Sequence, residues 1–117
     1  MRPDAVVDTV RSYSSGIVGR SLNSARTNHF VLDSPSGPGE AVGNGEAFLS
    51  GISSCGVTLI EHYAQENGIS INRMEVTIEG VRRPPNMAQF EAVNMRFEFS
   101  GVEQSQAEKL VQVWRDR

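Results

Sequence analysis

The stretch that decides the fold is GEAFLSGISSCGVTLIEHYAQEN, residues 45–67. Its apolar residues recur at three- and four-residue spacing, which predicts one long helix with a single buried face. Asn44 is a good N-cap, Glu46 lies in the first turn where a carboxylate favours the helix dipole, and Gly68 supplies the stop. Small residues crowd the middle of the stretch and let another backbone approach closely. This composition favours burial of the helix against a sheet or against a second copy of itself.

Short strands are expected before this helix. Residues 5–11 and 17–22 have the composition of two strands, with a turn over residues 14–16, and a third strand follows over Asn28–Asp33. Residues 34–44 contain three glycines and two prolines, too many for a regular element. The helix is therefore preceded by three strands and a loop.

Two longer strands and a second helix are expected after it. Apolar and polar residues alternate over residues 69–81 and 89–101, with a proline-containing turn between them, so the two segments should pair as an antiparallel hairpin. From Glu103 the apolar spacing becomes helical. The order predicts a single α+β domain over residues 1–117, with antiparallel strands packed around a long central helix.

Composition excludes several classes of function. The chain of 117 residues has a formal net charge of −3 and no clustered basic surface, so we expect no nucleic-acid partner. No apolar run is long enough to span a membrane, and the N-terminus carries Asp4 and Asp8 where a signal peptide would be apolar. One lone cysteine suits a reducing compartment, which predicts a cytoplasmic protein.

Cys55 is the only candidate redox nucleophile. An isolated cysteine on an apolar helix face is most often a small buried hydrophobe. A reactive role needs the thiolate, and about ten residues into a helix the dipole has faded, so an arginine from elsewhere in the fold would have to supply the charge. Glu46 lies nine residues earlier, roughly 13 Å along the helix and about half a turn around it, so the two side chains cannot meet within that helix. The simpler role of Glu46 is that of a helix-start glutamate.

Other candidate side chains are weaker. His62 follows Cys55 by seven residues, roughly 10 Å away and too far for a cysteine–histidine pair, and His29 lies in a strand. Neither has a metal-ligand companion at usable spacing, so we expect no metal site and no cofactor. Arg20 and Arg26 flank the second and third strands, and only the fold could bring either one to the thiol.

Residues 45–58 resemble the central-helix signature of the OsmC/Ohr family, in which a glycine-rich loop leads into a glutamate, then Leu or Phe with Leu, then small residues and a cysteine. The resemblance continues through residues 26–35, 63–68, 76–81 and 97–102. It therefore spans most of the chain in the order of elements that the family has.

This resemblance implies an intertwined homodimer whose central helices pack together, with two active sites at the dimer interface. In members that are peroxidases, the helix cysteine attacks an organic hydroperoxide or hydrogen peroxide and becomes a sulfenic acid. A second cysteine then forms a disulfide with it, and dithiol reductants restore both thiols. An arginine and a glutamate hold the cysteine as thiolate. Cys55 matches the helix cysteine, and both Arg20 and Arg26 match the arginine.

Three features depart from the family pattern. No second cysteine is present, and a truncated sequence, a damaged gene or a selenocysteine codon read as a stop are three explanations that stay open. The position of the family glutamate, ten residues before the cysteine, is Gly45, and Glu46 is its neighbour. The proline usual at this helix start is also missing. These departures favour the OsmC-like branch over the organic-hydroperoxide branch.

The leading hypothesis is a thiol-dependent peroxidase for oxidative stress defence. Cys55 would reduce organic hydroperoxides or hydrogen peroxide, with help from Arg20 or Arg26 and Glu46. Without a second cysteine, turnover would need an external thiol or dithiol reductant. The alternative is a non-catalytic OsmC-like dimer that binds a small apolar ligand or keeps only the fold. A third reading is an ordinary α+β domain with an inert, buried Cys55.

Overall fold

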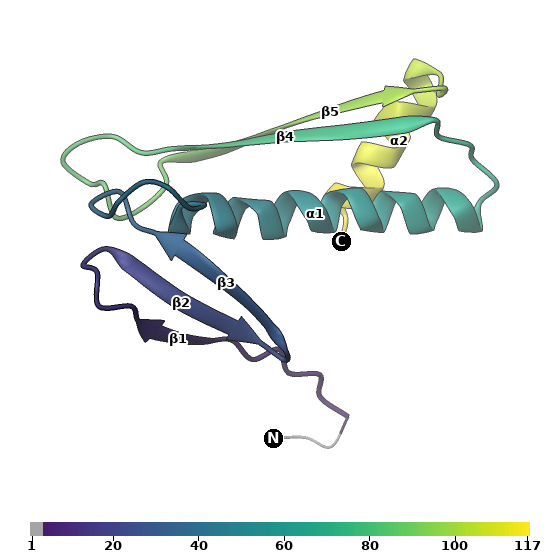
Figure 1. Ribbon diagram of the computed structural model, residues 1–117. Helices are drawn as coiled ribbons and strands as arrows, with labels where there is room; N and C mark the ends of the chain where they lie inside the picture. Colours follow the sequence, from purple (N-terminus) through teal and green to yellow (C-terminus); the bar gives the residue numbers. More distant parts are fainter. Residues whose placement is uncertain (1–3) are drawn as a thin grey trace. The chain divides into compact units, whose positions relative to one another are not determined.

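The computed structural model describes residues 4–117, and the described part of the chain forms five strands and two helices. This confirms the predicted α+β class (Figure 1). The chain divides into two compact units, Met1–Ala47 and Phe48–Arg117. The elements are, in order, β1 (Arg11–Ser14), β2 (Arg20–Ala25), β3 (Asn28–Asp33), α1 (Asn44–Glu66), β4 (Arg73–Val81), β5 (Ala92–Ser100) and α2 (Gln104–Arg115).

The first unit is built on a three-stranded antiparallel sheet in the order β1-β2-β3. β2 and β3 are joined by a two-residue turn, and their register places Arg20 opposite Asp33. The buried Asn23 accepts a hydrogen bond from the Ser12 hydroxyl at 2.6 Å and donates to the Phe30 carbonyl at 3.3 Å. These bonds satisfy the buried amide and tie the three strands together.

The predicted bounds of the first two strands are wrong. β1 begins at Arg11, where the predicted strand over residues 5–11 ends, and β2 begins at Arg20 instead of residue 17. The turn between them occupies residues 15–19 because Gly16 and Gly19 adopt positive φ angles of 93° and 89°. The Ser15 hydroxyl accepts a hydrogen bond from the Ile17 N–H at 3.1 Å and donates to the Arg20 carbonyl at 2.9 Å. The turn begins only after Ser14 and ends at Gly19, so both strands lie further towards the C-terminus than predicted.

α1 confirms the predicted central helix to within one residue at each end. The Ala47 N–H donates to the Gly43 carbonyl at 2.9 Å, so the N-cap is Gly43 and not the predicted Asn44. The Glu46 carboxylate reaches back and accepts the Gly43 N–H at 2.7 Å. Glu46 thus satisfies a backbone donor at the helix start, as in a capping box.

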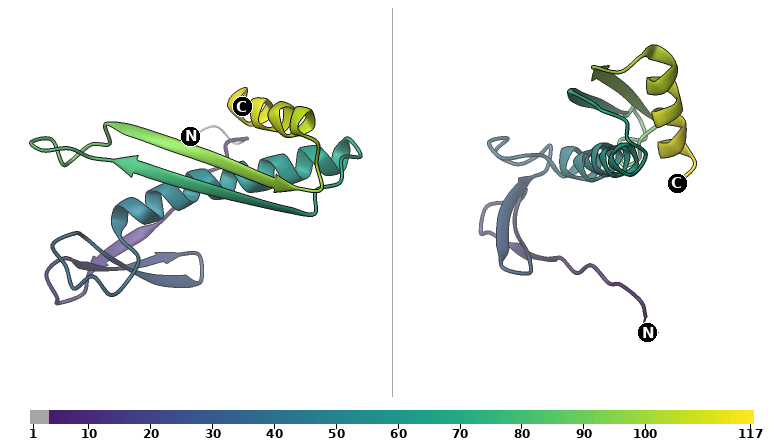
Figure 2. Two further views of the ribbon diagram at one scale, coloured as in Figure 1. Left: turned by 90° about the horizontal axis from the view of Figure 1, so that it is seen from above. Right: turned by 90° about the vertical axis from the view of Figure 1, so that its right-hand side faces the viewer.

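The second unit packs α1 along the β4–β5 hairpin, with α2 beside the hairpin (Figures 1 and 2). Gly56, Ile60 and Ala64 lie at four-residue spacing and form the buried face of α1. Gly56 faces the Phe97 ring of β5, and a Cβ atom there would lie 3.5 Å from that ring, an ordinary van der Waals distance. Leu110 of α2 completes a small core. Within the second unit, the helix has one face against the sheet and an opposite face that no other element of this unit covers, called here the uncovered face.

An aromatic cluster holds the start of α1 to the turn of the hairpin. The rings of Phe48 and Phe90 stack with centroids 6.1 Å apart, and the Arg82 guanidinium lies 4.8 Å from the centre of the Phe90 ring. Gly80 makes room for this arrangement, because a Cβ atom there would overlap the Phe90 ring. The cluster holds the turn between β4 and β5 beside the N-terminal part of α1.

Candidate functional site

Cys55 carries a free thiol at the surface of α1. It lies roughly 140° around the helix from the buried Ile60, so it is on the uncovered face of the helix and not on the face against the sheet. Gly51, one turn earlier, borders open space, since a Cβ atom there would meet nothing within 4 Å. The expectation of a buried, inert cysteine does not fit this position. The thiol is accessible to a small molecule in this chain.

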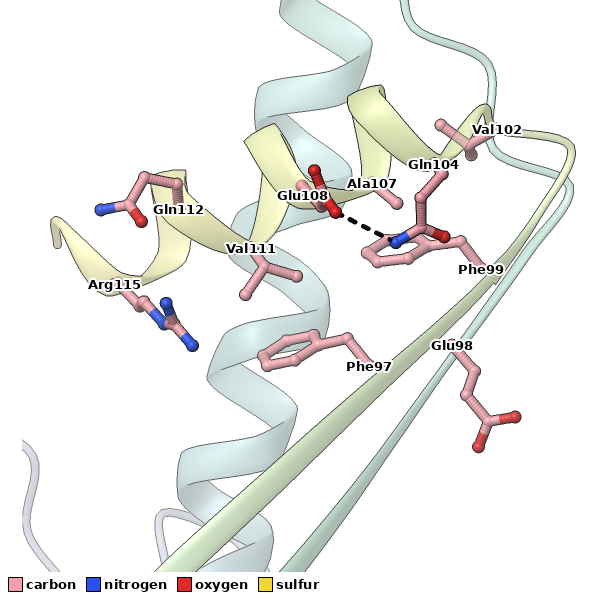
Figure 3. Close-up of a pocket in the computed structure, with 10 residues that line it drawn as sticks. All are labelled: Phe97, Glu98, Phe99, Val102, Gln104, Ala107, Glu108, Val111, Gln112 and Arg115. Atoms are coloured by element: carbon pink, nitrogen blue, oxygen red, sulfur yellow. Dashed lines mark hydrogen bonds between the residues drawn. The ribbon is translucent and has the colours of Figure 1, made fainter.

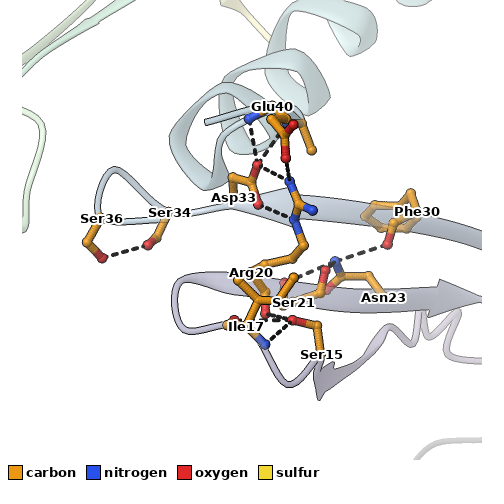
Figure 4. Close-up of polar contacts among 11 residues, drawn as sticks. Ser15, Ile17, Arg20, Ser21, Asn23, Phe30, Asp33, Ser34, Ser36 and Glu40 are labelled. Atoms are coloured by element: carbon orange, nitrogen blue, oxygen red, sulfur yellow. Dashed lines mark hydrogen bonds and ion pairs between the residues drawn. The ribbon is translucent and has the colours of Figure 1, made fainter. Parts of the chain in front are cut away.

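Arg20 lies at the centre of an ionic cluster in the first unit (Figure 4). Its Nε donates to Asp33 Oδ1 at 2.8 Å, and its Nη2 donates to Asp33 Oδ2 at 3.0 Å and to Glu40 Oε1 at 3.0 Å. The backbone N–H groups of Glu40 and Ala41 also donate to Asp33 Oδ2, at 2.9 and 2.8 Å. One carboxylate therefore holds both the arginine and the loop that leads to α1.

This cluster shifts the acid–base equilibria of its members. The Arg20 guanidinium, together with the N–H groups of Ala41 and Glu40, holds the pKa of the Asp33 carboxyl well below its usual range. Hydrogen bonds from Arg20 to Asp33 and Glu40 raise the pKa of the guanidinium above its ordinary value. Asp33 is 2% exposed, and a carboxylate this buried needs such partners. Both groups are charged at neutral pH.

Arg26 and Glu46, two further predicted site residues, are not part of this ionic cluster. Arg26 lies on the turn between β2 and β3, is exposed and has a positive φ of 57°. Within residues 4–117 its side chain makes no ion pair. Glu46 is engaged with Gly43. Arg20, Arg26 and Glu46 belong to the first unit and Cys55 to the second. The partners of Arg20 in the first unit are Asp33 and Glu40, neither of which the sequence analysis had named as a site residue.

Residues 4–117 contain neither a group of side chains that could hold a metal ion nor a helix that could span a membrane. His29 and His62 are both exposed, and no three histidine, cysteine or acidic side chains in this part gather where they could hold a metal. Neither of its two helices is long and apolar enough to cross a membrane.

A groove of about 570 Å³ runs between β5 and α2 in the second unit (Figure 3). Phe97 and Phe99 of β5 face Val111 of α2 across it, and Glu98 and Arg115 add charge at its borders. Cys55 does not line this groove. The groove is thus a feature separate from the thiol.

Asp33 and Glu40 were not predicted from the sequence as members of a site. The signal for Asp33 was present, because an aspartate and an arginine opposite each other in an antiparallel pair attract. That pairing could be seen only after β2 had been placed at Arg20–Ala25. Glu40 lies in an irregular loop and had no periodic signal.

Comparisons with known proteins support the fold described above and identify a family. The family model described as OsmC-like protein matches residues 37–117. An OsmC-like protein from Mycoplasma pneumoniae has a TM-score of 0.81 at 16% identity, covering 96% of this chain and 82% of that one. An organic hydroperoxide resistance protein OsmC from Legionella pneumophila has a TM-score of 0.75 at 20% identity, covering 95% and 83%. The organic hydroperoxide resistance protein OhrB of Bacillus subtilis has a TM-score of 0.68 at 15% identity, covering 95% and 84%. Comparison with curated protein sequences gave no match.

These structural similarities define the fold as that of the OsmC/Ohr proteins: three strands, a long helix, a hairpin and a second helix. The family model covers more than half of the chain, including the helix that carries Cys55. The chain belongs to the OsmC-like family.

Proposed function

We propose that the protein is a thiol-dependent peroxidase in which Cys55 reduces organic hydroperoxides or hydrogen peroxide. The observation that carries this proposal is a single free thiol, exposed on the uncovered face of the central helix of an OsmC-like chain. The names of the Legionella and Bacillus proteins, which refer to organic hydroperoxide resistance, support the substrate class. The exposed thiol and the open space beside Gly51, one turn earlier on the helix, are compatible with access by a small peroxide.

The reaction is a two-electron transfer. The Cys55 thiolate attacks one peroxide oxygen, an S–O bond forms and the O–O bond breaks, which gives a sulfenic acid and a leaving group. The leaving group is an alkoxide from an organic hydroperoxide, which takes a proton to become the alcohol, or hydroxide from hydrogen peroxide, which becomes water. An external thiol then condenses with the sulfenic acid, releasing water and leaving a mixed disulfide. A second thiol attacks that disulfide and restores Cys55. This sequence needs no second cysteine in the chain, and the thiol pool of the cytoplasm would supply the reductant.

Arg20 is the arginine that we assign to the thiolate. Its guanidinium is held in one orientation by Asp33, whereas Arg26 is an exposed turn residue with no ion-pair partner among residues 4–117. A pre-oriented cation stabilises a developing or standing negative charge without further ordering. Glu46 contributes through the helix start, where it accepts the Gly43 N–H.

We further propose that the active protein is a homodimer. The buried apolar core within residues 4–117 consists of Ile60, Ala64 and Leu110, which is small for a chain of this length. Apolar side chains on the first unit's sheet, such as Tyr13 and Leu22, are about half exposed. Association of two copies would cover such surface. Light scattering on the purified protein should give twice the mass of the chain, and a monomer at micromolar concentration would contradict the dimer.

Turnover tests the proposed activity. The reduced protein is mixed with cumene hydroperoxide or hydrogen peroxide and an excess of a dithiol or a monothiol, and the remaining peroxide is measured over time. We expect peroxide consumption well above the rate of the free thiols, with accumulation of a mixed disulfide when the monothiol is limiting. Cys55→Ser should reduce the rate to that of the free thiols. Equal rates for wild type and Cys55→Ser would exclude a peroxidatic Cys55.

A further inference from the structure

A cavity of about 430 Å³ lies beside the first unit's sheet. It is lined by residues of β1, of β2 and the turn after it, and of the segment before β1: Val7, Thr9, Arg11, Tyr13, Ser24 and Arg26. All six belong to the first unit. Pockets that hold small molecules begin at roughly 300 Å³, so this cavity has the size of a ligand site.

The β1–β2 register explains why these residues meet. Arg11 lies directly opposite Ser24 in the antiparallel pair. Side chains that are directly opposite share one face of the sheet, with Cβ atoms about 5 Å apart. Arg26 follows Ser24 by two residues, on the turn between β2 and β3, and lines the same cavity. Two guanidinium groups therefore border one cavity.

The polar side chains of this cavity are hydrogen-bond donors without partners. Within residues 4–117, none of them makes a hydrogen bond or an ion pair: Thr9, Arg11, Tyr13, Ser24 and Arg26. Hydroxyl groups can donate, and a guanidinium can only donate. The cavity thus offers several free donors to a ligand that supplies acceptors.

The charge of the two arginines is not balanced inside the cavity. Among residues 4–117, no acidic side chain lines it. Four other arginines in that range each pair with a carboxylate: Arg20, Arg73, Arg83 and Arg96. Two like charges that border one cavity repel each other, and an anion between them would remove that repulsion. The cavity therefore favours a negatively charged ligand.

Arg26 occupies a backbone position at which arginine is unusual. Its φ of 57° lies in the left-handed region. Glycine or asparagine usually takes a positive φ in a two-residue hairpin turn, because a larger side chain is strained there. The geometry of the turn does not call for arginine. Its side chain adds a cation to the cavity at a site where glycine would fold with less strain.

We propose that this cavity, called here the phosphate site, binds the phosphate group of a small molecule. Phosphate oxygens are hydrogen-bond acceptors, and the planar guanidinium fork matches them with two parallel N–H donors. Arg11 and Arg26 would donate to the phosphate oxygens and balance their charge, and the Ser24 hydroxyl would donate to another oxygen. The phosphate site goes beyond the proposed peroxidase and does not involve Cys55.

Titration of the purified full chain, followed by NMR of its backbone amides, tests the phosphate site. The probes are inorganic phosphate and phenyl phosphate, with chloride used to keep the ionic strength constant because salt screens exposed charges. We expect saturable shifts around Arg11 and Arg26 with a Kd of about 1 mM or lower, and none around Arg73 of the second unit. Saturation by either probe supports the site, and the tighter probe shows whether it takes free phosphate or a phosphate ester.

Two variants remove one arginine each. Arg11→Gln should weaken phosphate binding about tenfold or more, the size typical of losing a hydrogen bond to a charged group. Arg26→Gly should weaken it similarly and keep the fold, because glycine adopts a positive φ without strain. Arg73→Gln is the matched control, since it removes one exposed arginine of the second unit and changes the net charge equally. It should bind phosphate like wild type.

Shifts that grow linearly without saturation would overturn the phosphate site, because they report only general screening of surface charge. Equal affinity in wild type, Arg11→Gln and Arg26→Gly would overturn it as well. So would an equal loss in Arg73→Gln, since net charge would then attract the anion without this cavity. No readout involves Cys55, so a failure of the phosphate site is distinct from a failure of the peroxidase.

Discussion

Asp33→Asn is expected to lower the melting temperature by roughly 10 °C, a loss typical of removing one member of a buried ion pair. Asp33 is 2% exposed and accepts four hydrogen bonds, all from N–H donors. The asparagine amide carries its own N–H groups, so one of its two terminal atoms would face donors without accepting from them. Thermal unfolding followed by circular dichroism measures the loss. Asp8→Asn, at an exposed position, should melt like wild type.

The same variant should change how stability depends on pH. Because the pKa of Asp33 is lowered in the folded protein, this carboxyl contributes stability that is fully present above its unfolded value of about 4 and is lost as the pH falls below it. Wild type should therefore lose stability in acid, and Asp33→Asn should lack that part of the loss. The difference in melting temperature between wild type and Asp33→Asn should therefore become smaller below about pH 4. A constant gap from pH 7 to 3 would show that the charge of Asp33 does not stabilise the fold.

Arg20→Ala is expected to slow the oxidation of Cys55 by cumene hydroperoxide about tenfold or more at pH 7, because an unassisted cysteine is only a few per cent thiolate there. Arg26→Ala should stay close to wild type, since Arg26 is an exposed turn residue without an ion-pair partner in the described part of the chain. Stopped-flow oxidation of the reduced proteins gives both rates.

Folding must be separated from chemistry in this comparison. Arg20→Ala removes the partner of Asp33, so rates are taken well below the melting temperature of each variant. A chemical role predicts that raising the pH restores the rate of Arg20→Ala, as the thiol ionises without help. A purely structural role predicts a loss that pH does not restore. If Arg26→Ala is the slow variant, the assignment of the arginine is wrong.

Much of the fold could be predicted from local pattern. The apolar spacing of residues 45–67 located α1, and the alternation around residues 69–81 and 89–101 located β4 and β5. β1 and β2 could not be placed in this way. Their positions depend on a turn whose two glycines take positive φ angles and whose serine bonds to the backbone, and composition alone does not show which residues adopt that turn.

The site was less predictable than the fold. Cys55 was evident as the only cysteine, but its exposure depends on which helix face the sheet covers. Arg20 and Arg26 were equivalent in the sequence, because both flank strands. They became distinct once the β2–β3 register placed Asp33 opposite Arg20 and left Arg26 on the turn. Long-range pairing of this kind is a property of the folded chain and has no local signal.

Trapping the oxidised form of Cys55 is the most direct test of a peroxidatic thiol. The purified, reduced protein is mixed with one equivalent of cumene hydroperoxide in the presence of a sulfenic-acid trap, and the intact mass is followed over seconds to minutes. A peroxidatic Cys55 predicts rapid and complete addition of one trap molecule, absent in Cys55→Ser. If the folded protein stays unmodified in excess peroxide, Cys55 is not a peroxidatic thiol, and a non-catalytic OsmC-like role takes its place.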